Sequence, residues 1–202
     1  MTFPIWMQFS QPEVRNLAWC VLSPSLASIE TNDITIVKVD INDSVIEWLQ
    51  QLDHDPQSIN TWMDEFSSVR LGHRFEHYWR FLWAARGNHL DQLFNTQINT
   101  PTRTLGELDA LLLSAEHTVE HYELAIKFYL GYTSPNSNDT LWMGPNTNDR
   151  LDLKLKQMQT KQLTLLDRDK SAIPSHWDYH SISKKLIMKG RLFYPLKDNL
   201  NL

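Results

Sequence analysis

Two neighbouring runs of the chain place carboxylates and a lysine where they could act on one reacting group. Residues 104–113 and residues 122–130 are short and mostly apolar, which is typical of strands. Side chains alternate between the two faces of a strand, so Asp109 lies on one face of the first run. The same alternation puts Glu123 and Lys127 on one face of the second run. The pattern indicates an acid, acid, lysine group on adjacent strands.

Two interpretations of this group differ in their chemistry. In the first, Asp109 and Glu123 bind one hard divalent cation, Mg²⁺ or Mn²⁺, while Lys127 polarises the attacking water or a phosphate oxygen. In the second, Glu123 and Lys127 lie on the solvent face of a hairpin and form a cross-strand ion pair worth roughly 0.2–1 kcal/mol. The first interpretation predicts a nuclease centre.

A predicted helix over residues 69–86 supplies a further acid and a competing motif. Aromatic and aliphatic residues recur on one side of this helix, and Glu76 lies at the edge of that side, where it could complete a metal site. The segment His73-Arg74-Phe75-Glu76-His77 also matches H-x-x-E-H, a zinc-peptidase pattern with two histidine ligands one turn apart. Ordinary helix histidines and a boundary glutamate are the simpler interpretation.

Composition is typical of a soluble globular domain of 202 residues. The mean hydropathy is −0.41, and no apolar run reaches the roughly 18 residues that a membrane span needs. The amino terminus lacks the basic and apolar regions of a secretory signal, and Cys20 is the single cysteine. We therefore expect a cytoplasmic protein that does not insert into a membrane.

Charge is unevenly distributed along the chain. The net charge is −5, yet residues 150–191 contain ten Lys and Arg against four Asp and Glu. This excess fits either a face that contacts phosphates or a solvated helix face. Arg150, Lys154 and Arg191 are the predicted phosphate contacts, and nucleic acid is the predicted partner.

The remaining elements follow from periodicity and turn residues. Residues 1–68 are expected to form a mainly helical extension packed on a core of residues 69–196, with a frayed tail at 197–202. Residues 133–148 are rich in Ser, Asn, Pro and Gly and predict a loop. Predicted strands occupy residues 34–41, 90–100, 104–113, 122–130 and 185–194, and a predicted helix follows Asp149.

From residue 69 onward this gives an α-β-β-β-α-β order in an α/β (α+β) fold. The order resembles the core of the PD-(D/E)XK restriction-endonuclease-like nucleases. More closely, residues 14–196 resemble an uncharacterised bacterial family of unknown function that is grouped with those nucleases. The segments that carry the resemblance are RLGHRFE, RTLGELD, ELAIKFYL, GPNTNDRLDLKL and KGRLFYPL.

The resemblance implies roles for individual residues. Glu76 would be the helix acid, Asp109 the strand acid that binds Mg²⁺, and Lys127 the lysine of the third strand. The residue two before that lysine is usually acidic, but in this chain it is Ala125. Glu123 lies two residues earlier on the same face and would replace the missing acid.

Three functions follow from these observations. The leading one is a Mg²⁺-dependent nuclease. The second is a catalytically decayed module that keeps the fold and binds nucleic acid or protein through its basic side or through Trp79, Trp83 and Trp142. The third, less favoured, is a zinc peptidase that uses the HRFEH motif.

Overall fold

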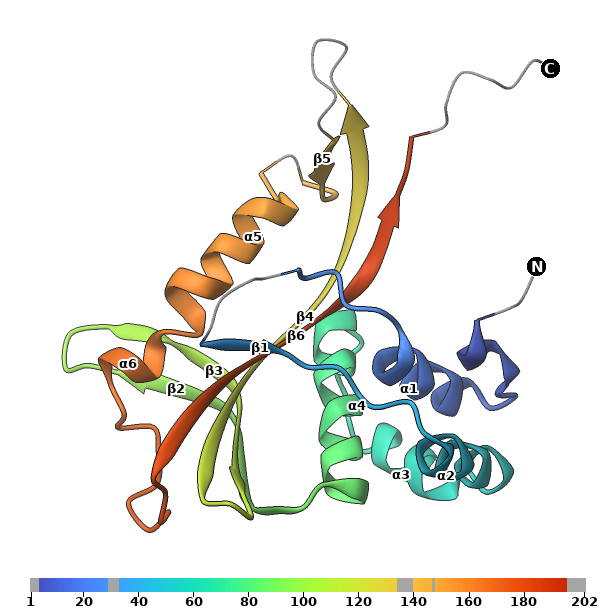
Figure 1. Ribbon diagram of the computed structural model, residues 1–202, viewed down its shortest axis with the longest axis horizontal. Helices are drawn as coiled ribbons and strands as arrows, with labels where there is room; N and C mark the ends of the chain where they lie inside the picture. The colour runs from blue at the N-terminus through green and yellow to red at the C-terminus, as the bar shows by residue number, and fades with distance from the viewer. Residues whose placement is uncertain (1–3, 29–32, 134–139, 147, 196–202) are drawn as a thin grey trace.

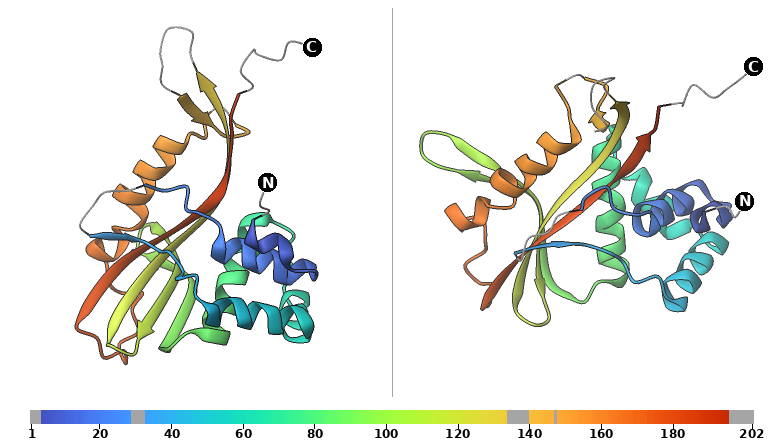
Figure 2. Two further views of the ribbon diagram at one scale, coloured as in Figure 1. Left: turned by 45° about the vertical axis from the view of Figure 1, so that its right-hand side comes forward. Right: turned by 45° about the horizontal axis from the view of Figure 1, so that its top comes forward.

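The computed structural model describes residues 4–28, 33–133, 140–146 and 148–195. A six-stranded mixed sheet separates two groups of helices, with α1 to α4 on one face and α5 and α6 on the other (Figure 1). The two rotated views in Figure 2 show the same separation. None of the described helices is long and apolar enough to cross a membrane.

Helices dominate residues 5–86, and most of the strands come after them in the chain. The helical segments are η1 (Ile5–Gln8), α1 (Pro12–Leu22), α2 (Asp43–His54), α3 (Gln57–Asp64), α4 (Leu71–Arg86), α5 (Leu151–Gln157), the π-helical η2 (Met158–Gln162) and α6 (Leu165–Arg168). The strands are β1 (Ile34–Ile36), β2 (His89–Asn99), β3 (Thr104–Ser114), β4 (Thr118–Thr133), β5 (Thr140–Met143) and β6 (Ser181–Phe193).

The sheet has the strand order β1-β6-β4-β3-β2, and β5 pairs with β4. The β6 strand is parallel to both of its neighbours, whereas β2, β3 and β4 are antiparallel. The pairing of β3 with β4 is short and runs only from Leu113↔Val119 to Ala110↔Tyr122. Beyond it, β3 continues beside β2 while β4 continues beside β6, so the strands separate (Figure 1). We call this point the strand fork.

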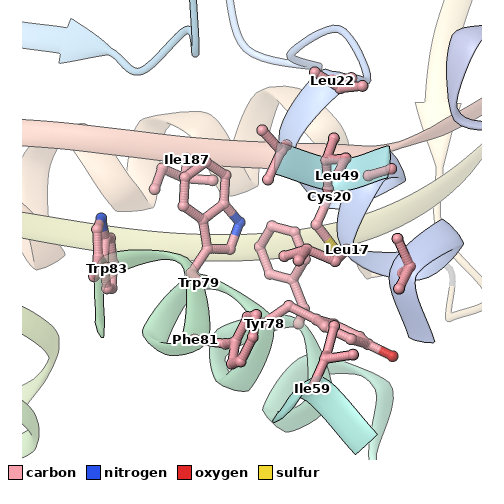
Figure 3. Close-up of a cluster of buried hydrophobic side chains, with 14 of the residues drawn as sticks. Leu17, Cys20, Leu22, Leu49, Ile59, Tyr78, Trp79, Phe81, Trp83 and Ile187 are labelled. Atoms are coloured by element: carbon pink, nitrogen blue, oxygen red, sulfur yellow. The ribbon is translucent and has the colours of Figure 1, made fainter. Parts of the chain in front are cut away.

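The helix-covered face on the α1 to α4 side contains the largest apolar cluster. Trp79 and Trp83 of α4 are 2% and 8% exposed and pack toward Ile187 of β6 (Figure 3). Helices α1, α2 and α3 add aliphatic side chains, among them Leu17, Leu49 and Ile59, which are fully buried. Burial of the two tryptophans leaves neither ring free to stack on a base, so this part of the binding-module prediction is wrong.

The opposite face is covered by the segment from α5 to α6. Ala125 and Tyr129 of β4 pack against Met158 and Leu163, while Leu165 and Leu166 pack against β3. The chain continues from α5 into a π-helical turn rather than ending there, and such turns commonly occur near functional sites. This segment lies across the strand fork from α4.

Several predicted boundaries differ from the structure. The strand expected over residues 34–41 is paired only at Ile34–Ile36, because it lies at the sheet edge beside β6. The polar stretch before residue 122 is a tight turn at His117, where φ is 55°, so β4 already begins at Thr118. The loop predicted over residues 133–148 contains β5, and the tail at 197–202 lies outside the described residues.

Gly190 provides a direct test of the β4–β6 geometry. Its φ is +153°, and an added Cβ would meet the carbonyl oxygen of Lys127 at 1.7 Å. We expect Gly190→Ala to lower the free energy of unfolding by at least about 2 kcal/mol, measured by urea denaturation. The control is Gly72→Ala in α4, where nothing lies within 4 Å and alanine should stabilise the helix by about 0.5–1 kcal/mol. Equal stability of the two variants would contradict the pairing.

Candidate functional site

Asp109 and Glu123 occupy the two branches of the strand fork. The last paired residues are Ala110 and Tyr122, so Asp109 precedes that pair on β3 and Glu123 follows it on β4. The backbone N–H of Leu124 donates to Oδ2 of Asp109 at 2.7 Å, in the place where a ladder hydrogen bond would otherwise continue. The structure therefore brings together the two acids that the alternation pattern selects.

Both carboxyl groups are held in a poorly solvated environment. Glu123 is fully buried, with 0% of its surface exposed, and Asp109 is half-buried. Burial, together with the neighbouring charge of Glu123, raises the pKa of Asp109 to about 8. Burial also raises the pKa of Glu123. A hydrogen bond from Asp109 to Glu123 acts on this pKa in the opposite direction. At neutral pH the pair therefore retains a proton.

His121 fixes one oxygen of Glu123. The two residues lie on the same face of β4, and Nε2 of His121 is 3.0 Å from Oε1 of Glu123. Burial lowers the pKa of His121 to about 4, so the ring is neutral and Nε2–H donates to the carboxylate. Oε2 of Glu123 is buried without a fixed donor among the described residues. Sequence reasoning missed His121, although its position two residues before Glu123 was the available signal.

A polar network from α4 and β2 borders the pair. Asn95 Nδ2 donates to Oε2 of Glu76 at 3.3 Å, and Arg80 donates to Oδ1 of Asn95. Arg80 also lies 3.7 Å from Glu76. The backbone of Asn95 has a φ of 47°, a conformation that asparagine tolerates well, and it stands opposite Asp109 in the β2–β3 register. Glu76 thus approaches the site as predicted, with its carboxylate engaged by Asn95 and Arg80.

Two lysines from different elements lie on the α5 side of β4, and of these Lys154 interacts with the carboxyl pair. Lys127 of β4 forms an ion pair with Asp149, with 2.8 Å between Nζ and Oδ2, and is 30% exposed. Lys154 of α5 donates from Nζ to Oε1 of Gln162 at 3.1 Å, which ties α5 to the π-helical turn. Burial lowers the pKa of Lys154, and the positive charge of Lys127 lowers it further. The negative charges of Glu123 and Asp109 act on Lys154 in the opposite direction.

Two of the three predicted phosphate contacts lie together, because Arg150 and Lys154 line one pocket with Lys127. Lys154 lies nearest the carboxyl pair, whereas Arg150 is bound by Asp152 at 2.7 and 3.0 Å. Arg191 pairs with Phe128 across β4 and β6 and lines a cavity beside α1, on the other face of the sheet. Arg191 therefore lies apart from Arg150 and Lys154, because its position on β6 directs it to the α1 side of the sheet.

The position of Ala125 explains the missing acid. Ala125 is 8% exposed and packs with Met158 and Leu163 under the π-helical turn. A carboxylate there would be buried against apolar side chains, at a cost of several kcal/mol. Glu123 is one alternation step closer to the strand fork, where Asp109 and His121 surround it.

The HRFEH motif makes packing contacts. His77 stacks between Trp62 and Phe66, and its Nε2 contacts the carbonyl oxygen of Trp62 at 3.0 Å. His73 contacts the hydroxyl of Ser68 at 2.9 Å through Nδ1. Each contact engages one nitrogen of its ring, and the two histidines turn to different partners.

The strand fork offers two oxygen ligands for a hard cation. Asp109 and Glu123 supply adjacent carboxylates, and the unpartnered Oε2 of Glu123 is a donor atom that a cation would satisfy. Within the described ranges, no three His, Cys, Asp or Glu side chains are grouped so that they could hold a metal ion. The donor set therefore fits a two-carboxylate site whose remaining ligands come from water or substrate.

Comparison with known proteins identifies a family without an assigned activity. A family model described as a domain of unknown function (DUF1853) matches residues 15–201. The chain therefore belongs to the DUF1853 family. Neither the curated proteins nor the solved structures contain a match to this chain.

The retained proton predicts how stability depends on pH. Because the folded pKa values of Asp109 and Glu123 lie above their ordinary values of 3.8 and 4.5, the folded state holds protons that the unfolded chain has released. Stability should fall as pH rises toward about 8, by up to about 1.4 kcal/mol per pH unit for each retained proton. Asp109→Asn should flatten this slope in urea denaturation.

The pH range and control separate this effect from others. His121 gives the opposite slope between about 4 and its ordinary pKa of 6.5, so the comparison belongs between pH 6.5 and pH 8. Glu116→Gln, in the exposed β3–β4 turn, should keep the wild-type slope. A slope that is the same in Asp109→Asn and wild type would show that the acids are separately solvated.

Proposed function

We propose that this DUF1853 protein is a Mg²⁺-dependent nuclease with a restriction-endonuclease-like core, and that Asp109 and Glu123 hold the ion. The observation that carries the proposal is the pairing of two poorly solvated carboxyl groups at the strand fork, with Lys154 as the nearest cation. A structural ion pair would not require two adjacent acids in a buried place, where burial raises the pKa of both and the charge of Glu123 adds to the shift of Asp109. A cation would remove their repulsion.

The element order supports the same proposal. Helix α4 supplies Glu76, β3 supplies Asp109, β4 supplies Glu123 and Lys127, and β6 lies beside β4 after the α5 segment. This is the α-β-β-β-α-β arrangement expected from the resemblance, with β5 as an added strand beside β4. Mn²⁺ is the natural alternative ion, because it also prefers oxygen ligands.

The protein's own groups would divide the remaining work. A bound Mg²⁺ would supply positive charge to the phosphate and lower the pKa of water. Asp109 must first release its proton, which makes binding stronger as pH rises. Lys154, half-buried beside the pair, would donate a hydrogen bond to a phosphate oxygen, and Lys127 would orient the attacking water once it leaves Asp149. Glu76 would contact the ion through water, because its carboxylate is engaged by Asn95 and Arg80.

The proposal predicts metal-dependent cleavage. Purified protein incubated with Mg²⁺ or Mn²⁺ should cleave at least one of single-stranded DNA, duplex DNA and RNA, as followed by gel electrophoresis. Asp109→Asn and Glu123→Gln should each reduce the rate by at least about 100-fold, because each removes charge that faces the ion. Glu116→Gln is the matched control and should retain the wild-type rate. Cleavage that survives both variants would refute the assignment.

Comparing two lysines of α5 in the same assay separates a contact at the site from general charge attraction. Lys154 faces the carboxyl pair, whereas Lys156 is exposed two residues later on α5. Lys154→Ala should lower the rate by at least about tenfold, and Lys156→Ala should change it little. Equal effects would indicate general charge attraction. Saturable binding of nucleic acid without cleavage would instead support the decayed binding module.

A further inference from the structure

A cavity of about 410 Å³ lies between η1, α1, α4 and the outer half of β4, away from the strand fork. Its volume falls within the range of small-molecule sites. Ile126 and Phe128 of β4 line it, whereas Lys127 between them faces the α5 side. The cavity and the strand fork therefore lie on opposite faces of the same sheet.

Aromatic side chains form much of the cavity wall. Phe75 and Tyr78 of α4 are 1% and 4% exposed and form a rigid base within the core cluster. Figure 3 shows Tyr78 in this cluster. Trp6, Trp19 and Phe128 are only partly buried, so their surfaces remain available to a ligand. Rigid aromatic walls with exposed faces favour a flat ring over a flexible chain.

The polar part of the lining is cationic. Of the described lining residues, three are arginines and none is acidic. Arg74 is already held by Glu13 at 2.9 Å and by the hydroxyl of Tyr78 at 3.2 Å. Arg15 makes one long hydrogen bond, 3.5 Å to the carbonyl oxygen of Ser10, and its charge also acts on Asp53. Among the described residues, Arg191 makes no hydrogen bond or ion pair.

We propose that this cavity binds a planar aromatic ring that carries an anionic group. The ring would lie between Trp6, Trp19 and Phe128, and the anion would lie beside Arg15 and Arg191. Guanidinium groups suit this role because their planar arrangement of N–H donors matches the oxygens of phosphate and carboxylate. In a chain with a net charge of −5, a cavity without an acidic lining residue among those described is a selective place for an anion.

Two sources could supply this chemistry, a nucleotide monophosphate or an aromatic carboxylate. Adenosine monophosphate is the test ligand for the first source, and indole-3-acetate is the test ligand for the second. Adenosine supplies only the ring of adenosine monophosphate, and inorganic phosphate supplies only its anion. We expect saturable binding of at least one complete anion in isothermal titration calorimetry without added metal. Adenosine and phosphate should each bind at least about tenfold more weakly than adenosine monophosphate if the nucleotide is the ligand.

Matched variants locate the binding. Arg191→Gln and Trp6→Leu should each weaken the better ligand by at least about tenfold, because one removes the charge and the other the ring contact. Arg103→Gln, in the exposed β2–β3 turn, is the control and should bind as wild type. Asp109→Asn should also bind as wild type, so this result is independent of nuclease activity.

Three results would overturn the proposal. The first is no saturable binding of either anion up to about 1 mM. The second is equal affinity for adenosine and adenosine monophosphate together with no binding of indole-3-acetate. The third is unchanged affinity in both Arg191→Gln and Trp6→Leu. Circular dichroism of each variant distinguishes a lost contact from a lost fold, and Arg191→Gln retains the test if Trp6→Leu does not fold.

Discussion

The contact between Asp109 and Glu123 at the strand fork is the interaction on which the rest of the site depends. Two acids that face each other in a poorly solvated place cannot both ionise without a large cost, so they hold a proton or require a cation. The sheet creates this situation because the β3–β4 pairing ends at Ala110 and Tyr122, the residues next to the two acids. The Leu124 N–H, bonded to Asp109, then holds the two branches in place.

The surrounding elements can be understood from this constraint. His121 orients one oxygen of Glu123 and remains neutral, so it adds no charge. Glu76 and Arg80 approach from α4 and are joined by Asn95, while Lys154 approaches from α5 on the other side. The acids therefore lie between two layers of helices, and the π-helical turn that follows α5 is bonded to Lys154 through Gln162.

Alternation within β3 and β4 was sufficient to select Asp109 and Glu123, because side-chain direction in a strand is a local property. Alternation could not identify the partners of Lys127 and Lys154. Asp149 meets Lys127 only because the segment after β5 folds back onto β4, and Lys154 meets the acids only because α5 lies over that face. Such contacts arise from tertiary packing between separate elements.

The helix α4 and the strands β2, β3 and β6 follow the expected order, since their apolar periodicity is long and regular. Predictions failed where a neighbour decides the outcome. Only three residues of β1 pair at the sheet edge, and β5 forms in a polar segment because β4 extends beyond the helices to meet it. The charge count also named Arg191 together with Arg150 and Lys154, since such a count contains no information about register.

The most direct test of the central claim counts protons. Titration calorimetry of Mn²⁺ into the protein at pH 7, repeated in buffers with different ionisation enthalpies, reports how many protons the site releases on binding. We predict a release of at least about one proton in the wild type and a smaller release in Asp109→Asn, because the variant removes one of the two carboxyl groups whose pKa is raised. Binding without proton release, or the same release in both proteins, would contradict a shared proton at the strand fork.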